Sequence, residues 1–389
     1  MARVRTGLDR IVQGDPDVAA LVRGRRIGLL AHPASVDAQL VHAESRLRHL
    51  ADLRVLFGPE HGYTGQAQDM ASVASTEASA VRVHSLYGER FEDLSPRQAW
   101  LRDLDAVVVD LQDVGSRYYT FVWSAALMLT ACAQAGVQTI ILDRPNPLGG
   151  KVMEGLEQRP GYRSFVGLYD VPVRHGLTIG EICRMVQQKD GIAPEALQVV
   201  PMEGYRRAMH FGDTALPWVL PSPNMPTVET ALVYPGGCLV EGTNLSEGRG
   251  TTRPFELWGA PDVDGAALAQ SVNVDGAILR PTSFEPTFHK YGKQTCGGVQ
   301  VHVADRARLR SYAGYLRMLA WVAKHAPTFA FRTATYEYVS DRPAIDLLTG
   351  GPEFRTAVLA GQVDDALVDW LATPSAAFAE ERKAYLLYA

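Results

Sequence analysis

Short apolar runs alternate with longer segments of mixed polarity along the first half of the chain. The segments between the runs have the apolar spacing of helices, as in residues 42–52. The runs have the length and the content of branched residues that buried strands require, and they cover residues 26–32, 53–58, 81–87, 106–112 and 138–144. Apolar strands that alternate with helices are typical of a parallel sheet covered on both faces. The pattern therefore predicts a Rossmann-like α/β domain.

Several helix ends are marked by residue type. Ser95 and Pro96 predict the start of a helix over residues 95–104, as N-cap and first helical residue. Gly136 predicts the end of a long helix that follows the run at 106–112. The sequence TIGE at 178–181 predicts a capping box, in which a threonine and a glutamate each satisfy a backbone amide.

The pattern changes in the second half of the chain. Residues 217–235 are crowded with prolines, which is typical of a domain junction. A segment rich in glycine and threonine follows at 241–259, and then a strand-like run at 297–305 and a helix-like pattern at 307–327. These features predict a smaller α+β domain.

With 389 residues the chain is long enough for two domains. We predict a Rossmann-like catalytic domain over residues 1–228 and a smaller α+β domain over 229–389 that completes a cleft. A hydrophobic content of 47% with 21% charged residues is that of an ordinary globular protein.

Charge and hydropathy narrow the expected partners. The net charge of −5 offers no basic excess for nucleic acid or an anionic membrane surface, so neither is an expected partner. No stretch approaches the roughly 18 apolar residues of a membrane span, and the N-terminal residues lack the apolar segment of a secretory signal. We therefore expect a cytoplasmic protein.

The motifs of common cofactor sites are absent from the sequence. The four cysteines are widely spaced with no C-x-x-C pair, which argues against a disulfide framework or a zinc site. Neither a dinucleotide fingerprint, a phosphate-binding P-loop nor a nucleophile-elbow serine is present. Glu60 and His61 are adjacent, so their side chains diverge and seldom hold one ion. We expect no cofactor and no metal.

Chemically capable side chains follow the predicted strands at the same end. In an open parallel sheet, ligands bind beyond the carboxyl ends of the strands. The side chains at this edge are His32, Glu60, His61, Asp113, Arg117, Tyr118, Asp143 and Asn146. A carboxylate directly after a buried strand is costly to hold unless something uses it, so Glu60 is the strongest candidate. Others have structural interpretations: Asp143 with Arg144 in a local ion pair, His32 as a loop cap, and Tyr118 as core.

Long motifs in the chain resemble the NamZ-type exo-β-N-acetylmuramidases, formerly a domain of unknown function. The motifs are LFGPEHGYTG, DLQDVGSRYYTF, LDRPNPLGG, PSPNMPT and EGTNLSEGRGTTRPFELWGAP. The resemblance runs from about Arg26 to the C-terminus. It implies an active site in the cleft between a Rossmann-like domain and a smaller domain. It also implies release of N-acetylmuramic acid from the non-reducing end of peptidoglycan fragments of the MurNAc-GlcNAc type, in cell wall recycling. The family's proposed catalytic glutamate, in its P-E-H-G motif, corresponds to Glu60.

Glycoside hydrolysis needs a protonated carboxylic acid at the leaving oxygen and a second group at the anomeric carbon. Glu60 suits the general acid. The second group stays open between the 2-acetamido group of the sugar and the carboxylates of Asp113, Asp143, Glu241 and Glu247.

The lactyl carboxylate of muramic acid calls for a cation, for which Arg117, Arg249 and Arg253 are candidates. The further predicted substrate-binding residues are His32, His61, Tyr118, Asn146, Glu241, Asn244 and Glu247. We expect the loop at 241–252 to fold over the sheet edge and close the sugar subsite. The alternatives are a metal-dependent hydrolase or deacetylase at the same edge, and a sugar-binding protein without catalysis.

Overall fold

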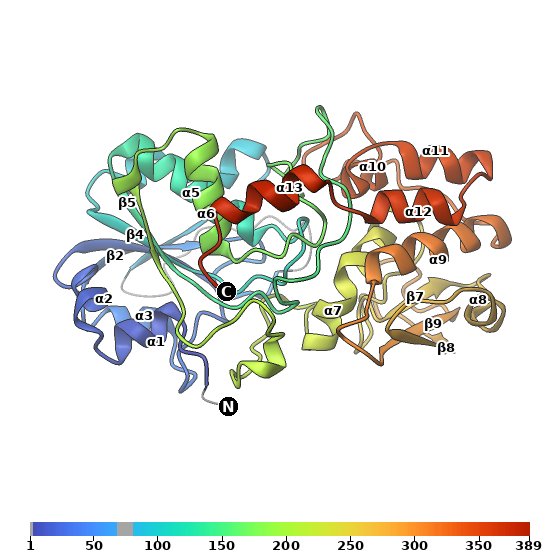
Figure 1. Ribbon diagram of the computed structural model, residues 1–389, viewed down its shortest axis with the longest axis horizontal. Coiled ribbons are helices and arrows are strands. Elements are labelled where there is room, and N and C mark those ends of the chain that lie inside the picture. The colour runs from blue at the N-terminus through green and yellow to red at the C-terminus, as the bar shows by residue number, and fades with distance from the viewer. Residues whose placement is uncertain (1–2, 68–80) are drawn as a thin grey trace.

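A computed structural model of the protein describes residues 3–67 and 81–389. Figure 1 shows two halves side by side, the first around a large sheet and the second around a smaller one. Six strands form the larger sheet, all in parallel pairs and in the order β3-β2-β1-β4-β5-β6. They are β1 (Arg26–Ala31), β2 (Asp52–Gly58), β3 (Arg82–Ser85), β4 (Ala106–Asp110), β5 (Gln138–Leu142) and β6 (Leu197–Val200). The predicted α/β class is confirmed, and the strand order reverses between β1 and β4, the position where such sheets bind ligands.

Helices cover both faces of this sheet. One face packs on α5 (Phe121–Ala135) and α6 (Ile179–Lys189), and the other on α1 (Gly7–Val12), α2 (Pro16–Ala20) and α3 (Ala43–Leu47). Figure 1 shows the two groups above and below the strands. Since successive side chains of a strand point to opposite faces, both alternating sets must be apolar. Val107 and Val109 of β4 accordingly belong to the core under α5, and Ala106 and Val108 to the core under α1.

Two of the predicted helix ends are confirmed. Helix α5 ends at Gly136, whose φ of 70° is left-handed, and both bonds of the capping box between Thr178 and Glu181 are present at α6. The predicted start at Ser95 and Pro96 is wrong. Helix α4 is only Gln98–Leu101, because the Ser95 amide donates to Glu92 and closes the preceding 3-10 helix η1 (Phe91–Leu94).

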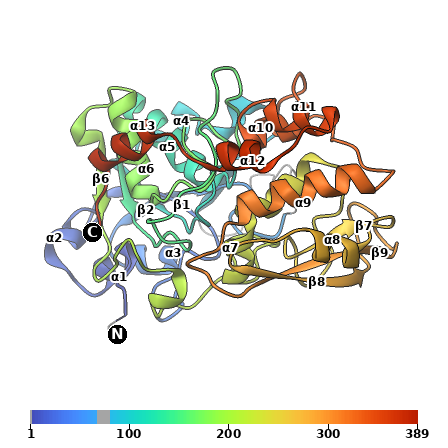
Figure 2. The ribbon, with the colours of Figure 1, turned by 45° about the vertical axis from the view of Figure 1, so that its right-hand side comes forward.

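The C-terminal half contains a three-stranded antiparallel sheet in the order β7-β9-β8, with long helix α9 packed nearby (Figure 2). The strand predicted at 297–305 corresponds to β9, and the helix predicted at 307–327 corresponds to α9. The remaining elements are η2 (Pro194–Ala196), η3 (Phe211–Asp213), α7 (Val228–Gly237), η4 (Cys238–Gly242), β7 (Leu257–Ala260), α8 (Gly265–Ser271), β8 (Ala277–Phe284), β9 (Cys296–Val303), α9 (Ser311–His325), α10 (Ala344–Thr349), α11 (Glu353–Ala360), α12 (Asp365–Ala372), α13 (Ala376–Glu381) and η5 (Arg382–Ala384).

The last residues of the chain return to the first half, where α13 lies beside α6 in both views (Figures 1 and 2). The Tyr388 hydroxyl donates to Asp143 Oδ2 at 2.6 Å and accepts from the Met202 amide at 3.0 Å. The Arg207 amide donates to the Ala389 carbonyl at 2.8 Å. The end of the chain thus completes the unit around the large sheet, and the boundary at residue 228 stays a prediction.

In the part of the chain that the structure describes, no helix is long and apolar enough to cross a membrane. The cytoplasmic location stays a prediction.

Candidate active site

A small cavity of about 30 Å³ lies between the two halves, beyond the carboxyl ends of the strands. The residues that line it are buried. From the first half and the junction they are Glu60, His61, Tyr118, Tyr119, Thr120, Val166, Ser222, Asn224 and Met225. From the second half they are Tyr234, Glu241, Arg249, Phe255, Tyr336 and Glu337. Both halves therefore supply polar and aromatic groups to one cavity.

A tight turn presents Glu60 to this cavity. Strand β2 ends at Gly58, and a Cβ on that residue would lie 2.4 Å from the Tyr63 nitrogen, so only glycine allows the turn to fold back this closely. His61 has a left-handed φ of 68°, a strained conformation that is common at functional sites. The sequence after the strand thus aims an acid at the cavity instead of continuing the sheet.

The two oxygens of Glu60 have different surroundings. The Thr120 hydroxyl donates to Oε2 at 2.5 Å. Oε1 is buried and has no hydrogen-bond partner among the described residues. Water cannot easily replace that partner, because Glu60 is only 5% exposed. An unpartnered buried oxygen costs free energy, so it is a position where a ligand group is expected.

Two further carboxylates line the cavity. Glu241 accepts from Arg249 Nη2 at 2.6 Å and from the Tyr336 hydroxyl at 2.8 Å. Glu337 accepts from the Tyr87 hydroxyl at 3.2 Å and lies on a backbone with a positive φ of 45°. Left-handed residues other than glycine are uncommon, so the loop at Glu337 is held in place by its surroundings.

A buried ion cluster lies behind Arg249. Glu247 pairs with Arg249 Nε at 3.1 Å, with Lys290 Nζ at 3.0 Å and with His289 Nδ1 at 3.2 Å. Burial acts to raise the pKa of Glu247, but Lys290 and the other cations outweigh it and hold that pKa well below its ordinary value. Arg249 also lies 5.2 Å from the centre of the Phe255 ring. These contacts fix the guanidinium from several sides.

Comparison with known proteins decides the family. Two family models, for the N-terminal and C-terminal parts of the exo-β-N-acetylmuramidase NamZ, match residues 27–229 and 232–388. A Bacillus subtilis (strain 168) protein described as peptidoglycan β-N-acetylmuramidase NamZ is 39% identical over 393 residues, which cover 99% of this chain and 92% of that protein. The chain belongs to the exo-β-N-acetylmuramidase NamZ family. The resemblance inferred from the motifs is confirmed, and with it the expectation of a glycoside hydrolase of this type.

Solved structures agree with this assignment. Two crystal structures of DUF1343 family proteins from Bacteroides fragilis NCTC 9343 have the same fold. One has a TM-score of 0.82 at 28% identity and full coverage of both chains. The other has a TM-score of 0.74 at 25% identity and covers 100% of this chain and 99% of its own. The predicted fold class is therefore confirmed for this NamZ family member.

Five of the predicted site residues line the cavity, namely Glu60, His61, Tyr118, Glu241 and Arg249. Those that do not line it are His32, Asp113, Arg117, Asp143, Asn146, Asn244 and Glu247. Sequence reasoning missed Thr120, Tyr336 and Glu337. Thr120 lies within one of the NamZ-type motifs, so the motif could have identified it as a site residue. Glu337 follows no predicted strand and lies in none of these motifs.

His32 is held as a neutral ring. Its Nε2 accepts from the Gln112 amide at 2.9 Å, so Nδ1 carries the proton and donates to the Pro221 carbonyl at 3.2 Å. Burial lowers the pKa of His32 to about 3. The ring thus ties the sheet edge to the proline-rich junction.

Asp143 is enclosed by donors from the fold. The Thr178 hydroxyl, the Gly180 amide and the Tyr388 hydroxyl donate to it. Burial raises the pKa of Asp143 to about 6, against the lowering effect of these donors. The local pair that the sequence suggested does not form, because Arg144 pairs with Asp110 at 2.5 Å.

Arg117, Asn146 and Asn244 bind backbone groups instead of the cavity. Arg117 is fully buried and donates to the carbonyls of Leu156, Val171 and Leu348. Asn146 donates to the Leu177 carbonyl, and Asn244 to that of Thr328.

Asp113 accepts from the Gly115 amide at 2.9 Å and lies 3.5 Å from His175 Nε2. The catalytic or binding roles of the residues outside the cavity stay predictions.

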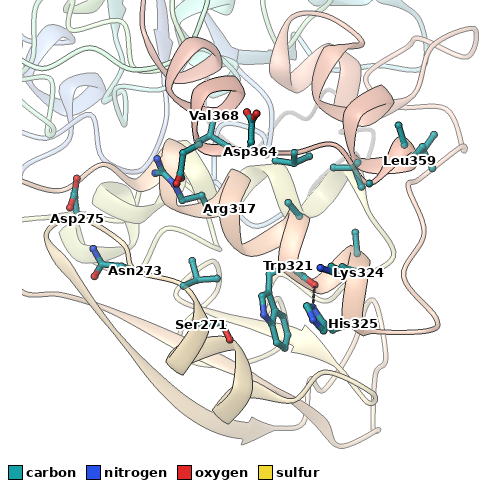
Figure 3. Close-up of a pocket in the computed structure, with 18 residues that line it drawn as sticks. Ser271, Asn273, Asp275, Arg317, Trp321, Lys324, His325, Leu359, Asp364 and Val368 are labelled. Atoms are coloured by element: carbon teal, nitrogen blue, oxygen red, sulfur yellow. Dashed lines mark hydrogen bonds and ion pairs between the residues drawn. The ribbon is translucent and has the colours of Figure 1, made fainter.

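A larger hollow of about 1000 Å³ lies elsewhere, among α8, α9, α11 and α12 (Figure 3). Of the charged groups that line it, Arg317 pairs with Asp365 at 2.9 Å and with Asp369 at 2.8 Å. Trp321 stacks on His325 with ring centres 4.2 Å apart. None of the described residues that line it lines the cavity at Glu60, so size alone does not locate the active site.

Within residues 3–67 and 81–389, no three His, Cys, Asp or Glu side chains are arranged to hold a metal ion.

Proposed function

We propose that this protein hydrolyses the β-glycosidic bond next to a terminal N-acetylmuramic acid, at the non-reducing end of MurNAc-GlcNAc type fragments of peptidoglycan. The observation that carries the proposal is the pair of unlike oxygens on Glu60. Family membership supports the chemistry, and the cavity shared by the two halves supports the location.

Glu60 acts as the general acid. Because the Thr120 hydroxyl already donates to Oε2, the transferable proton belongs on Oε1. Oε1 then gives this proton to the glycosidic oxygen as the bond to the anomeric carbon breaks.

Glu337 is the second carboxylate in this proposal. Of the earlier candidates, Asp113, Asp143 and Glu247 do not line the cavity. Glu241 does line it, but its charge is balanced by Arg249 at 2.6 Å. Glu337 lines the cavity and accepts from the Tyr87 hydroxyl at 3.2 Å, a contact that holds its carboxylate toward the anomeric centre. It either takes a proton from the attacking water or orients the 2-acetamido group that attacks in its place.

Arg249 receives the lactyl carboxylate of the sugar. Among the described residues, Arg249 is the one arginine that lines the cavity. Arg253, in contrast, is half-exposed and paired with Glu256 at 3.5 Å. A guanidinium binds a carboxylate through two parallel hydrogen bonds, and the Glu241 and Glu247 contacts orient that fork before substrate arrives.

The test measures release of N-acetylmuramic acid from a MurNAc-GlcNAc disaccharide by the full chain. We expect turnover by the wild type, and in Glu60→Gln a kcat lower by roughly 10²-fold or more with KM little changed, since only the transferable proton is removed. Glu195→Gln is the matched control, because Glu195 is exposed on η2. A Glu60→Gln enzyme with near-native kcat contradicts the assignment.

The same assay separates the alternatives. A metal-dependent hydrolase loses activity in a chelator, and a deacetylase releases acetate instead of a free sugar. A sugar-binding protein without catalysis binds the disaccharide but leaves it intact.

A further inference from the structure

A second hollow adjoins the catalytic cavity. It has a volume of about 560 Å³ and is lined by residues 223–224, 250–252 and 284–288. Asn224 lines both spaces. Gly250 directly follows Arg249, which lines the cavity. The two spaces are therefore neighbours along one path that starts at Glu60.

The two spaces differ in their access to solvent. The residues that line the cavity are buried, whereas Thr252, Glu285 and Phe288 in the second hollow are exposed. Phe288 is 42% exposed, which is a large apolar surface to leave in water. The exposed hollow is thus the larger of the two spaces, and a substrate bound at Glu60 extends to solvent through it.

The lining of the second hollow has the chemistry of a sugar site. An aromatic ring offers a flat apolar face to the C–H face of a pyranose, and short hydroxyl and amide side chains suit its polar groups. Phe288 supplies the ring, and Thr251, Thr252 and Asn224 supply the polar groups. Among the described residues of this lining, Glu285 is the charged one, so the hollow suits an uncharged sugar.

The loop that carries Phe288 is fixed to the wall of the cavity. The Thr287 amide and hydroxyl both donate to the Gly250 carbonyl, at 3.0 and 2.9 Å. Gly250 has a φ of +81°, and a Cβ there would lie 2.8 Å from the Phe288 nitrogen. Lys290 reaches Glu247, the partner of Arg249. The backbone on both sides of Phe288 is thus anchored to the segment and the ion cluster that hold Arg249, which lowers the cost of ordering a ligand.

We propose that this hollow is the subsite for the leaving group, holding an uncharged N-acetylhexosamine on the reducing side of the cleaved bond. The inference rests on the proposed function. Glu60 protonates the glycosidic oxygen, the bond to the anomeric carbon breaks, and the sugar departs as an alcohol over Phe288. Water supplies the hydroxyl of the released muramic acid.

The experiment compares two substrates of the full-length enzyme, the MurNAc-GlcNAc disaccharide and methyl β-N-acetylmuramide, which has no leaving-group sugar. In Phe288→Ala we expect kcat/KM to fall roughly tenfold for the disaccharide and less than about twofold for the methyl glycoside, as loss of one ring contact implies. Phe288→Tyr restores the wild-type ratio of kcat/KM for the disaccharide to kcat/KM for the methyl glycoside. Thr252→Val, a surface change that preserves side-chain shape, lowers this ratio as Phe288→Ala does. Ile278→Ala, which removes another exposed apolar side chain, leaves it unchanged.

The outcomes separate the two proposals. If the wild type cleaves both muramides and Phe288→Ala loses activity on both equally, or on neither, the subsite is wrong and the hydrolase assignment stands. If the wild type cleaves neither substrate, the proposed function fails and the subsite with it.

Discussion

At the scale of single residues, the carboxylates of this protein differ more in their partners than in their burial. Glu60, Glu241, Glu247 and Glu337 are all buried. Glu241 and Glu247 face cations, whereas Glu60 and Glu337 accept from the hydroxyls of Thr120 and Tyr87. A cation within contact distance stabilises the charge of its partner, so Glu241 and Glu247 serve to position Arg249. We assign the catalytic roles to Glu60 and Glu337, which line the cavity and accept from hydroxyls.

This distinction predicts the effect of changing Glu337. Glu337→Gln removes the negative charge at the anomeric centre, and we expect kcat to fall by roughly 10²-fold or more with the fold intact. Tyr87→Phe keeps the charge and removes one hydrogen bond, so its effect is smaller. The assay is steady-state hydrolysis of the disaccharide. A Glu337→Gln enzyme that retains most of its kcat would move the second role back to Glu241 or to the substrate.

Arg249 gives a prediction about selectivity. Arg249→Lys keeps the positive charge between Glu241 and Glu247 but loses the two parallel donors of the guanidinium. We expect kcat/KM for a muramide to fall at least about tenfold, with little change for the matching glucosaminide, which has no lactyl carboxylate. Arg253→Lys, outside the cavity, is the control. Equal losses on both sugars would show that Arg249 only stabilises the fold.

Because of His32, the free energy of unfolding should depend on pH. Its pKa of about 3 lies below the ordinary 6.5, so between these values the unfolded chain binds a proton that the folded chain excludes. Stability from this group is fully present above pH 6.5 and falls by up to about 1.4 kcal/mol per pH unit as the pH drops toward 3. Asp143, with its pKa raised to about 6, acts in the opposite direction between about pH 4 and 6.

The contribution of His32 to stability is measured by comparing wild type with His32→Gln. In urea unfolding at pH 7, 6 and 5, the stability advantage of wild type over His32→Gln should shrink as the pH falls. His49→Gln, at an exposed position, should run parallel to wild type. Parallel curves for His32→Gln as well would mean that the ring is protonated in the folded state.

At the scale of elements, the sequence predicted what depends on local pattern. Strands β1, β2, β4 and β5 are apolar because both sheet faces are covered, and their ends lead directly to Glu60 and Tyr118 at the cavity. Strand β6 (Leu197–Val200) was not predicted, because it has only four residues and two of them are not fully buried. Short edge strands carry little periodicity to detect.

The second half of the site was less predictable for a different reason. Glu337 lies in an irregular loop whose positive φ depends on packing against Tyr87, a residue 250 positions away. Glu241 and Arg249 were found because they share one long motif. Asp143 follows a strand as expected, but it does not line the cavity, because its carboxylate accepts from donors that distant parts of the chain supply. Only the folded structure reveals such partners.

At the scale of the whole molecule, the two halves share one apolar core and one cavity. One apolar core contains residues of α5 and α6 together with residues of α7, α9 and α12. The cavity takes its wall from both halves, and the chain end returns to the large sheet. A fragment that stops at residue 228 would therefore lack Glu241, Arg249 and Glu337, and also Tyr388, the partner of Asp143.

The returning chain end gives the last prediction. Tyr388→Phe removes the hydroxyl that donates to Asp143 and accepts from the Met202 amide, which leaves buried polar groups unsatisfied. We expect the free energy of unfolding to fall by about 1–3 kcal/mol, while kcat at 25 °C stays near the wild-type value because Tyr388 does not line the cavity. Tyr169→Phe is the matched control, since its hydroxyl donates to Asp190 at an exposed position, where the loss is small. Equal, small losses in the two variants would show that the tail lies on the sheet without stabilising it.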